Sequence, residues 1–84
     1  MNIWNTDLKP GVTVVVPCYN EEGAVTETVE AIAAVLDLAA TDKNKPFDSE
    51  MIFVNDGSKD NTLKILLELE AKHPRLRIVD NGTN

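Results

Sequence analysis

One stretch of the chain decides its fold: residues 12–21, which read Val-Thr-Val-Val-Val-Pro-Cys-Tyr-Asn-Glu. The β-branched run at 12–16 is typical of a strand that is buried on both faces, as in a parallel sheet. Pro17 has no amide hydrogen for a sheet hydrogen bond, so we expect the strand to end there. Asn20 can cap a helix, and the acidic Glu21 favours the positive end of a helix dipole. The stretch therefore predicts a strand that turns directly into a helix.

The segments that follow alternate in the same way. Apolar residues at helical spacing predict a helix from about 21 to 40, and a polar loop at 41–48 comes next. The sequence Met-Ile-Phe-Val within 50–55 predicts a second short buried strand.

The last third of the chain repeats the pattern. Asp60 can cap a second helix that has Thr62 in its first turn and continues to about residue 72. Alternating apolar residues predict a third strand at 75–80, and a turn is expected at 81–84.

The order β-α-β-α-β predicts an α/β fold with three parallel strands in the spatial order 3-2-1. Right-handed crossovers gather the strand-to-helix turns at one edge of such a sheet. This is half of a three-layer, Rossmann-like domain, so we expect one sheet face and one edge to lack their cover. A chain that stops after a third strand indicates part of a longer protein, and a complete three-stranded module is the alternative.

Length and charge exclude some classes of partner. The chain has 84 residues, which suits one small domain. Its net charge is −6 and no basic stripe is present, so we expect no nucleic-acid partner. The longest apolar stretch falls short of the roughly 20 residues that span a bilayer. We therefore expect a soluble chain with no transmembrane segment and no signal peptide at its start.

The two strand-to-helix turns carry the candidate binding residues. They lie at the carboxyl edge of the sheet, where open α/β folds bind ligands. The Tyr19 ring can stack on a base or close the end of the sheet as core. Asp56 can accept hydrogen bonds from a base or ribose, or form an Asx turn, and Gly57 serves either use. Together the turns predict a cradle for a nucleotide base and its ribose.

Other residues near the turns have simpler explanations. For Asn20 a helix cap is favoured over a ligand contact, and Glu21 is most simply a partner of the helix dipole. Cys18, the only cysteine, is interpreted as a small buried filler rather than a nucleophile, because no partner base is evident. The sequence has no metal-ligand spacing, no Walker-type loop and no Gly-x-Gly-x-x-Gly fingerprint. No catalytic or metal-binding residue is predicted.

Two segments resemble the start of the inverting family-two nucleotide-sugar glycosyltransferases, which have the GT-A fold: VTVVVPCYNEE at 12–22 and IFVNDGSKDNT at 52–62. Each motif alone is moderately specific, whereas the pair, with a strand-helix pattern between and after, is strongly specific. The wording FVNDGS looks most like the branch that transfers sugars to polyprenyl phosphates. The resemblance implies an N-terminal arm at 1–11, and at 12–84 the first part of a nucleotide-sugar-binding domain, truncated before an Asp-x-Asp motif.

The resemblance also implies a nucleotide-sugar site. Tyr19 would pack at the base, Asp56 would bind the base or its ribose, and Glu21 would line the site. The full set that it implies is Pro17, Tyr19, Asn20, Glu21, Asp56 and Gly57. The family often has Asp-Asp-Gly-Ser, and here Asn55 takes the first acidic place. We expect this departure to be tolerated, because Asp56 holds the second place.

The implied reaction moves a sugar from a UDP-sugar or GDP-sugar to an acceptor such as a polyprenyl phosphate, with inversion. A general base assists attack of the acceptor, and Mg or Mn stabilises the leaving nucleoside diphosphate. The metal-binding motif and the base would both lie beyond residue 84, so the chain alone is expected to be inactive. The implied location is cytoplasmic, at the membrane face in a longer parent.

A different class of function competes with this one: a small α/β binding or interaction module without a nucleotide site. Every residue singled out has a structural role in that interpretation. A donor site should leave Tyr19 and Asp56 accessible at one edge, whereas a structural module should bury Tyr19 and satisfy Asp56 within its own turn. An exposed sheet edge or helix face also predicts a homo-oligomer.

Overall fold

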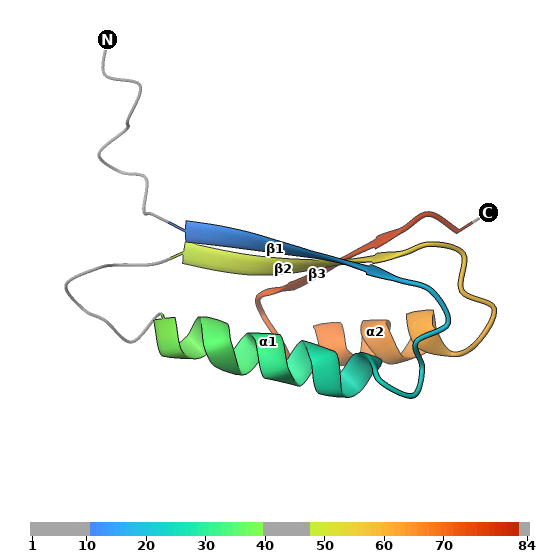
Figure 1. The fold of residues 1–84 in the computed structure, drawn as a ribbon, viewed down its shortest axis with the longest axis horizontal. Helices are drawn as coiled ribbons and strands as arrows, with labels where there is room; N and C mark the ends of the chain where they lie inside the picture. The colour runs from blue at the N-terminus through green and yellow to red at the C-terminus, as the bar shows by residue number, and fades with distance from the viewer. Residues whose placement is uncertain (1–10, 40–47, 83–84) are drawn as a thin grey trace, which may run out of the picture.

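A computed structural model describes residues 11–39 and 48–82. Three parallel strands pair in the order β1-β2-β3, which is the predicted sheet, and two helices connect them (Figure 1). Residues 1–10 of the predicted arm at 1–11, most of the loop at 41–48 and residues 83–84 lie outside the described residues, whereas Gly11 belongs to the first strand. The elements are β1 (Gly11–Cys18), α1 (Val25–Ala39), β2 (Asp48–Asn55), α2 (Thr62–Glu70) and β3 (Leu76–Asp80).

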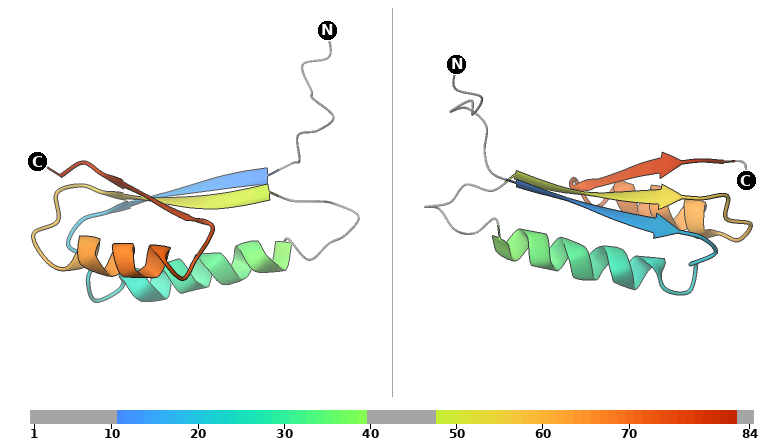
Figure 2. Two further views of the ribbon diagram at one scale, coloured as in Figure 1. Left: turned by 180° about the vertical axis from the view of Figure 1, so that it is seen from behind. Right: turned by 45° about the horizontal axis from the view of Figure 1, so that its top comes forward.

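Both helices lie against the same face of the sheet (Figures 1 and 2). Each connection moves one strand further in the same direction, and right-handed crossovers then place both helices on one side. The described residues therefore form two layers. The prediction that the first strand is buried on both faces is wrong: on the face away from the helices Val15 is 59% exposed, which fits the expectation that one sheet face lacks its cover. No other described element covers that face.

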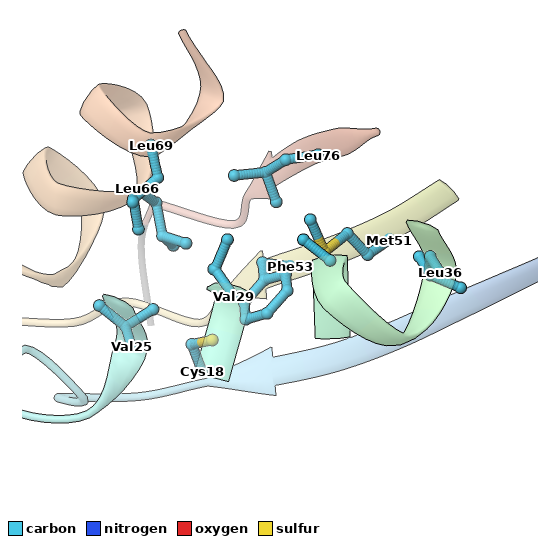
Figure 3. Packing of buried hydrophobic residues seen from close by; sticks show 10 residues of the cluster. Cys18, Val25, Val29, Leu36, Met51, Phe53, Leu66, Leu69 and Leu76 are labelled. Carbon is cyan, nitrogen blue, oxygen red and sulfur yellow. The ribbon is translucent and has the colours of Figure 1, made fainter. Parts of the chain in front are cut away.

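The core lies between β2 and the two helices (Figure 3). Met51 and Phe53 point to the helices because alternate strand residues share a face, and both are fully buried. Val29 of α1 and Leu66 of α2 are likewise fully buried, and Figure 3 shows both in the same cluster as Phe53. Burying such side chains is the main source of stability in a domain of this size.

Several boundaries differ from those predicted. β1 continues through Pro17, which lies opposite Val54, to Cys18. The carbonyl of Cys18 accepts a bond from the amide of Asp56 (2.9 Å), so the neighbouring Pro17 nitrogen faces the open edge of the sheet. An edge strand tolerates proline there, because no ladder hydrogen bond is lost. β2 begins two residues earlier than predicted, and α2 ends two residues earlier.

Replacing the central aromatic residue tests this core. Phe53→Ala is expected to lower the free energy of unfolding by about 3–5 kcal/mol, because it leaves a cavity that two helices cannot close. Val35→Ala is the control, since Val35 is 65% exposed on α1, and its effect should stay within about 0.5 kcal/mol. Urea unfolding measures both. Equal effects of the two variants would contradict the assigned core.

Candidate functional site

The two strand-to-helix loops lie side by side at the carboxyl end of the sheet (Figure 1). The β1–α1 loop comprises residues 19–24 and the β2–α2 loop comprises residues 56–61. They start from neighbouring positions, because Cys18 is the register partner of Asn55 in the parallel pair. The two sequence motifs, far apart in the chain, therefore meet at one edge as predicted.

Tyr19 and Asp56 are the first residues of these two loops, and both are exposed. The Tyr19 side chain is 47% exposed and so does not serve as core. The amide of Asp56 donates to the carbonyl of Cys18, which continues the β-ladder one step beyond the strand ends. Gly57 follows with a φ of 76°, a left-handed conformation that favours glycine. An aromatic ring, a carboxylate and a glycine thus stand together at an accessible edge.

The prediction that Asn20 caps the first helix is wrong. α1 begins five residues later, at Val25, and Asn20 has a φ of 52°. Its amide donates to Oγ of Ser58 (2.9 Å), and its Oδ1 accepts from the amide of Lys59 (2.8 Å). Asparagine is one of the few residues that adopt the left-handed region readily. Asn20 therefore ties one loop to the other rather than starting a helix.

The next two amides of the first loop donate to the second loop and to the first residue of α2. The amide of Glu21 donates to Oγ1 of Thr62 (2.8 Å), and the amide of Glu22 donates to Oδ2 of Asp60 (3.2 Å). In return, Nδ2 of Asn61 donates to Oε2 of Glu22 (3.3 Å). We call this set of bonds the inter-loop network; its members are Asn20, Glu21, Glu22, Ser58, Lys59, Asp60, Asn61 and Thr62.

Asp60 accepts more bonds than a helix cap requires. Its Oδ1 accepts from both the amide (2.9 Å) and the hydroxyl of Thr62, the first residue of α2. Asn61 occupies the cap position itself and makes no side-chain capping bond. The Thr62 hydroxyl has the largest effect and lowers the pKa of Asp60; burial opposes it, and backbone amides including that of Glu22 lower the pKa further. Asp60 thus caps the first amide of α2, that of Thr62, as predicted. Its second oxygen accepts from the amide of Glu22 in the other loop.

Asn55, in the first acidic place of the family motif, points away from the site. It is the third residue of the helix-facing series that begins with Met51 and Phe53, and it is 2% exposed. Its Nδ2 donates to Oδ1 of Asp80 (3.0 Å), which also accepts from the amide of Gly82 (3.0 Å). A carboxylate at 55 could not donate this bond. The asparagine is therefore matched to an acid at the end of β3.

A small cavity of about 150 Å³ lies beside the end of β1 and the start of α1. Pro17 and Glu21 line it, as do Cys18 and Thr28, whereas Tyr19 does not. It is smaller than the pockets of roughly 300–1,000 Å³ that hold drug-sized ligands. The implied site residues therefore divide into two groups: Pro17 and Glu21 line this cavity, whereas Tyr19, Asn20, Asp56 and Gly57 do not.

Cys18 is buried, and its thiol lies 3.9 Å from the carbonyl oxygen of Val16. Burial, and then the charge of Glu21, raises the pKa of the thiol. A buried thiol with a raised pKa carries little thiolate and is a poor nucleophile. The structure therefore supports its interpretation as a small core residue.

Carboxylates are frequent at this edge but are not arranged for a metal ion. Within residues 11–39 and 48–82, no group of three or more His, Cys, Asp or Glu side chains could hold one. Both oxygens of Asp60 are already engaged by protein donors. The described residues thus do not fit the divalent cation that the family resemblance implies. In the same ranges, no helix is long and apolar enough to cross a membrane.

Comparison with known proteins gives a consistent result. Residues 13–84 match Glycosyl transferase family 2. The chain is 42% identical over 72 residues to the dolichyl-phosphate beta-glucosyltransferase ALG5C of Trichomonas vaginalis, covering 86% of this chain and 21% of that protein. It is also 42% identical over 72 residues to the uncharacterized glycosyltransferase YkcC of Bacillus subtilis (86% and 20%). A bactoprenol glucosyl transferase of Shigella phage SfV is 35% identical over 63 residues (75% and 19%). The chain spans about a fifth of the length of these curated relatives.

Exchanging the residues at 55 and 80 tests their pairing. Asn55→Asp is expected to lower the free energy of unfolding by about 1–3 kcal/mol, because a buried donor is lost and two carboxylates face each other. In the double variant Asn55→Asp/Asp80→Asn the donor and acceptor change places, so most of the stability should return. Urea unfolding at neutral pH measures this. A double variant whose loss equals or exceeds that of Asn55→Asp alone would refute the pairing.

The network should also respond to acid. Because the pKa of Asp60 is lowered in the folded state, its stabilisation is complete above the ordinary value of 3.8 and is lost as the pH falls through the folded value. Thermal unfolding of the wild type and Asp60→Asn, from about pH 6 down to about pH 2, measures this contribution as a difference. The wild type should be more stable than Asp60→Asn near pH 6, and the difference in stability between the two should narrow below pH 3.8. A gap that is constant or widens on acidification would contradict this assignment.

Proposed function

This chain belongs to glycosyl transferase family 2, and we propose that it supplies the donor-nucleotide part of a sugar-transferring enzyme. The observation that carries the proposal is the exposure of Tyr19 and Asp56 at the ends of two paired strands. The Tyr19 ring offers a face on which a base can stack. The Asp56 carboxylate can accept hydrogen bonds from N–H groups of a base or hydroxyls of a ribose. The other implied site residues shape the surface around Tyr19 and Asp56; they are Pro17, Asn20, Glu21 and Gly57.

The charge at this edge favours the base and ribose over the diphosphate. Glu21, Glu22, Asp56 and Asp60 are acidic, and Lys59 is the one basic residue of the two described loops. A diphosphate would be repelled there unless a cation neutralised it. We propose that Mg or Mn, bound by residues outside those described, supplies that charge neutralisation. The part played by this chain is to bind the nucleoside end of a UDP-sugar or GDP-sugar.

For the whole protein we propose transfer of a sugar to a polyprenyl phosphate with inversion at the anomeric carbon. Two relatives carry names that specify dolichyl phosphate and bactoprenol as acceptors, which supports this class. Such an acceptor places the reaction at a membrane surface, and we propose its cytoplasmic face. We further propose that residues 1–84 are inactive alone, because the general base would lie in the remainder of the protein.

The alternative, a binding module without a nucleotide site, fits less well. It requires Tyr19 as a core residue, and the side chain is nearly half exposed.

The predicted homo-oligomer is a separate proposal. The uncovered face of the sheet, with Val15 exposed at 59%, is the surface that would support it.

Titration of the 84-residue chain with UDP and with GDP, each with and without Mn, tests the function through backbone-amide NMR shifts. The shifts should concentrate at Tyr19 and at Asp56 and Gly57, with one nucleotide preferred. Tyr19→Ala and Asp56→Asn should each weaken binding about tenfold, through loss of stacking or of a charged acceptor.

Glu68→Gln is the matched control, because Glu68 is an exposed carboxylate near the far end of α2, and it should leave binding unchanged. The purified wild-type 84-residue chain should transfer no labelled sugar from UDP-glucose or GDP-mannose to a polyprenyl phosphate. Absence of nucleotide binding both in this chain and in the whole protein would refute the proposed function.

A further inference from the structure

We propose that Thr62 and Asp60 are positioning residues of the donor site: through the inter-loop network they hold Tyr19 and Asp56 in a fixed relation. This inference rests on the proposed function and deepens it. Neither residue needs to touch the nucleotide. Their role is to set the two loops that carry the residues that do.

The placement of the bonds is the first argument. Tyr19 lies between Cys18, whose carbonyl accepts from the amide of Asp56, and Asn20, which is bonded to Ser58. On the other loop, Asp56 is bonded through its own amide, and Lys59 is bonded to Asn20. Bonds between the two chain segments thus lie on both sides of Tyr19, and they lie at Asp56 itself and just beyond it at Ser58 and Lys59.

Thr62 provides a relay that few side chains can make. It is fully buried, and its hydroxyl accepts from the amide of Glu21 (2.8 Å) while donating to Asp60. A hydroxyl both donates and accepts at one oxygen atom. Valine has nearly the same shape but can do neither. It would leave the Glu21 amide without its acceptor and remove one donor from Asp60.

The network exceeds what the helices need. Asp60 already satisfies the first amide of α2 through its bond to Thr62. The bonds to the amides of Glu21 and Glu22 add nothing to α2, and they lie before the start of α1 at Val25. Both helices are joined to the sheet by buried apolar residues such as Val29 and Leu66. What these additional bonds fix is the course of the first loop.

The network also limits which part of a nucleotide can bind here, because it uses backbone amides that could otherwise bind phosphate. Free amides before a helix commonly bind phosphate. In this chain the amides of Asn20, Glu21 and Glu22 already donate to Ser58, Thr62 and Asp60. These three amides are therefore not available to bind a phosphate. This agrees with a site for the nucleoside end.

Thr62→Val and Thr62→Ser, compared in the whole protein, test the proposal. Thr62→Val should raise the dissociation constant of the preferred nucleotide, and the KM for the donor, about fivefold, the effect of one ordinary hydrogen bond. Thr62→Ser keeps the hydroxyl and should restore wild-type values. The KM for the acceptor should not change in either variant. Exchange of the Glu21 amide, measured by NMR in the 84-residue chain, should be faster in Thr62→Val alone.

Two further variants keep the test independent of folding. Ser58→Ala removes the acceptor of the Asn20 amide from a partly exposed position and should weaken nucleotide binding in the same way even if Thr62→Val does not fold. Asp37→Asn breaks an ion pair with Arg75 (3.2 Å) between α1 and the residue before β3, away from the loops. It controls for a general loss of stability and should leave the dissociation constant unchanged.

The outcomes separate the two proposals. If the wild type binds a nucleotide and both Thr62→Val and Ser58→Ala bind it equally well, positioning is refuted and the donor site stands. If Asp37→Asn weakens binding as much as they do, the effect is one of stability and positioning is again refuted. If the wild-type whole protein binds no nucleotide, the proposed function fails, and this inference fails with it.

Discussion

The hydrogen bond from the amide of Asp56 to the carbonyl of Cys18 is the constraint on which the candidate site depends. It carries the parallel pairing of β1 and β2 past the last paired residues, Cys18 and Asn55. Because side chains alternate along a strand, a shift of one residue would exchange the faces of every residue in β2. Phe53 would then leave the core. The register that builds the core is therefore the register that brings Tyr19 beside Asp56.

The molecule divides its polar and apolar residues by position along the strands. On the face toward the helices, Met51 and Phe53 build the core, and the same series ends in Asn55, paired with Asp80. Beyond the strand ends, hydrogen bonds between side chains and amides replace apolar contacts. Such bonds are directional, so they fix the loops more sharply than burial of apolar surface, which is non-directional.

Sequence patterns predicted the elements, their order and the parallel sheet, and they left open whether Tyr19 and Asp56 would be exposed, as a donor site requires, or serve a structural module. They did not predict the inter-loop network. Asparagine suits both a helix cap and a left-handed residue. The contact that fixes the second conformation here is the hydrogen bond from the Asn20 amide to Ser58, which lies 38 residues away in the sequence. The β-branched run at 12–16 suggested a strand buried on both faces, whereas the half-domain order predicted one uncovered sheet face, and the 59% exposure of Val15 agrees with the second expectation. At Asn20 local propensity yields to tertiary partners, and at Val15 the run alone cannot show whether an element covers its second face.

The strand order has a consequence for how the protein is made. Each strand pairs with the next one in the sequence, β1 with β2 and β2 with β3. No described strand waits for a partner that is translated much later. The sheet can therefore grow from its amino-terminal strand while the ribosome is still synthesising the chain, since domains commonly fold in this direction during synthesis. The loops that carry Tyr19 and Asp56 would be joined as soon as α2 emerges.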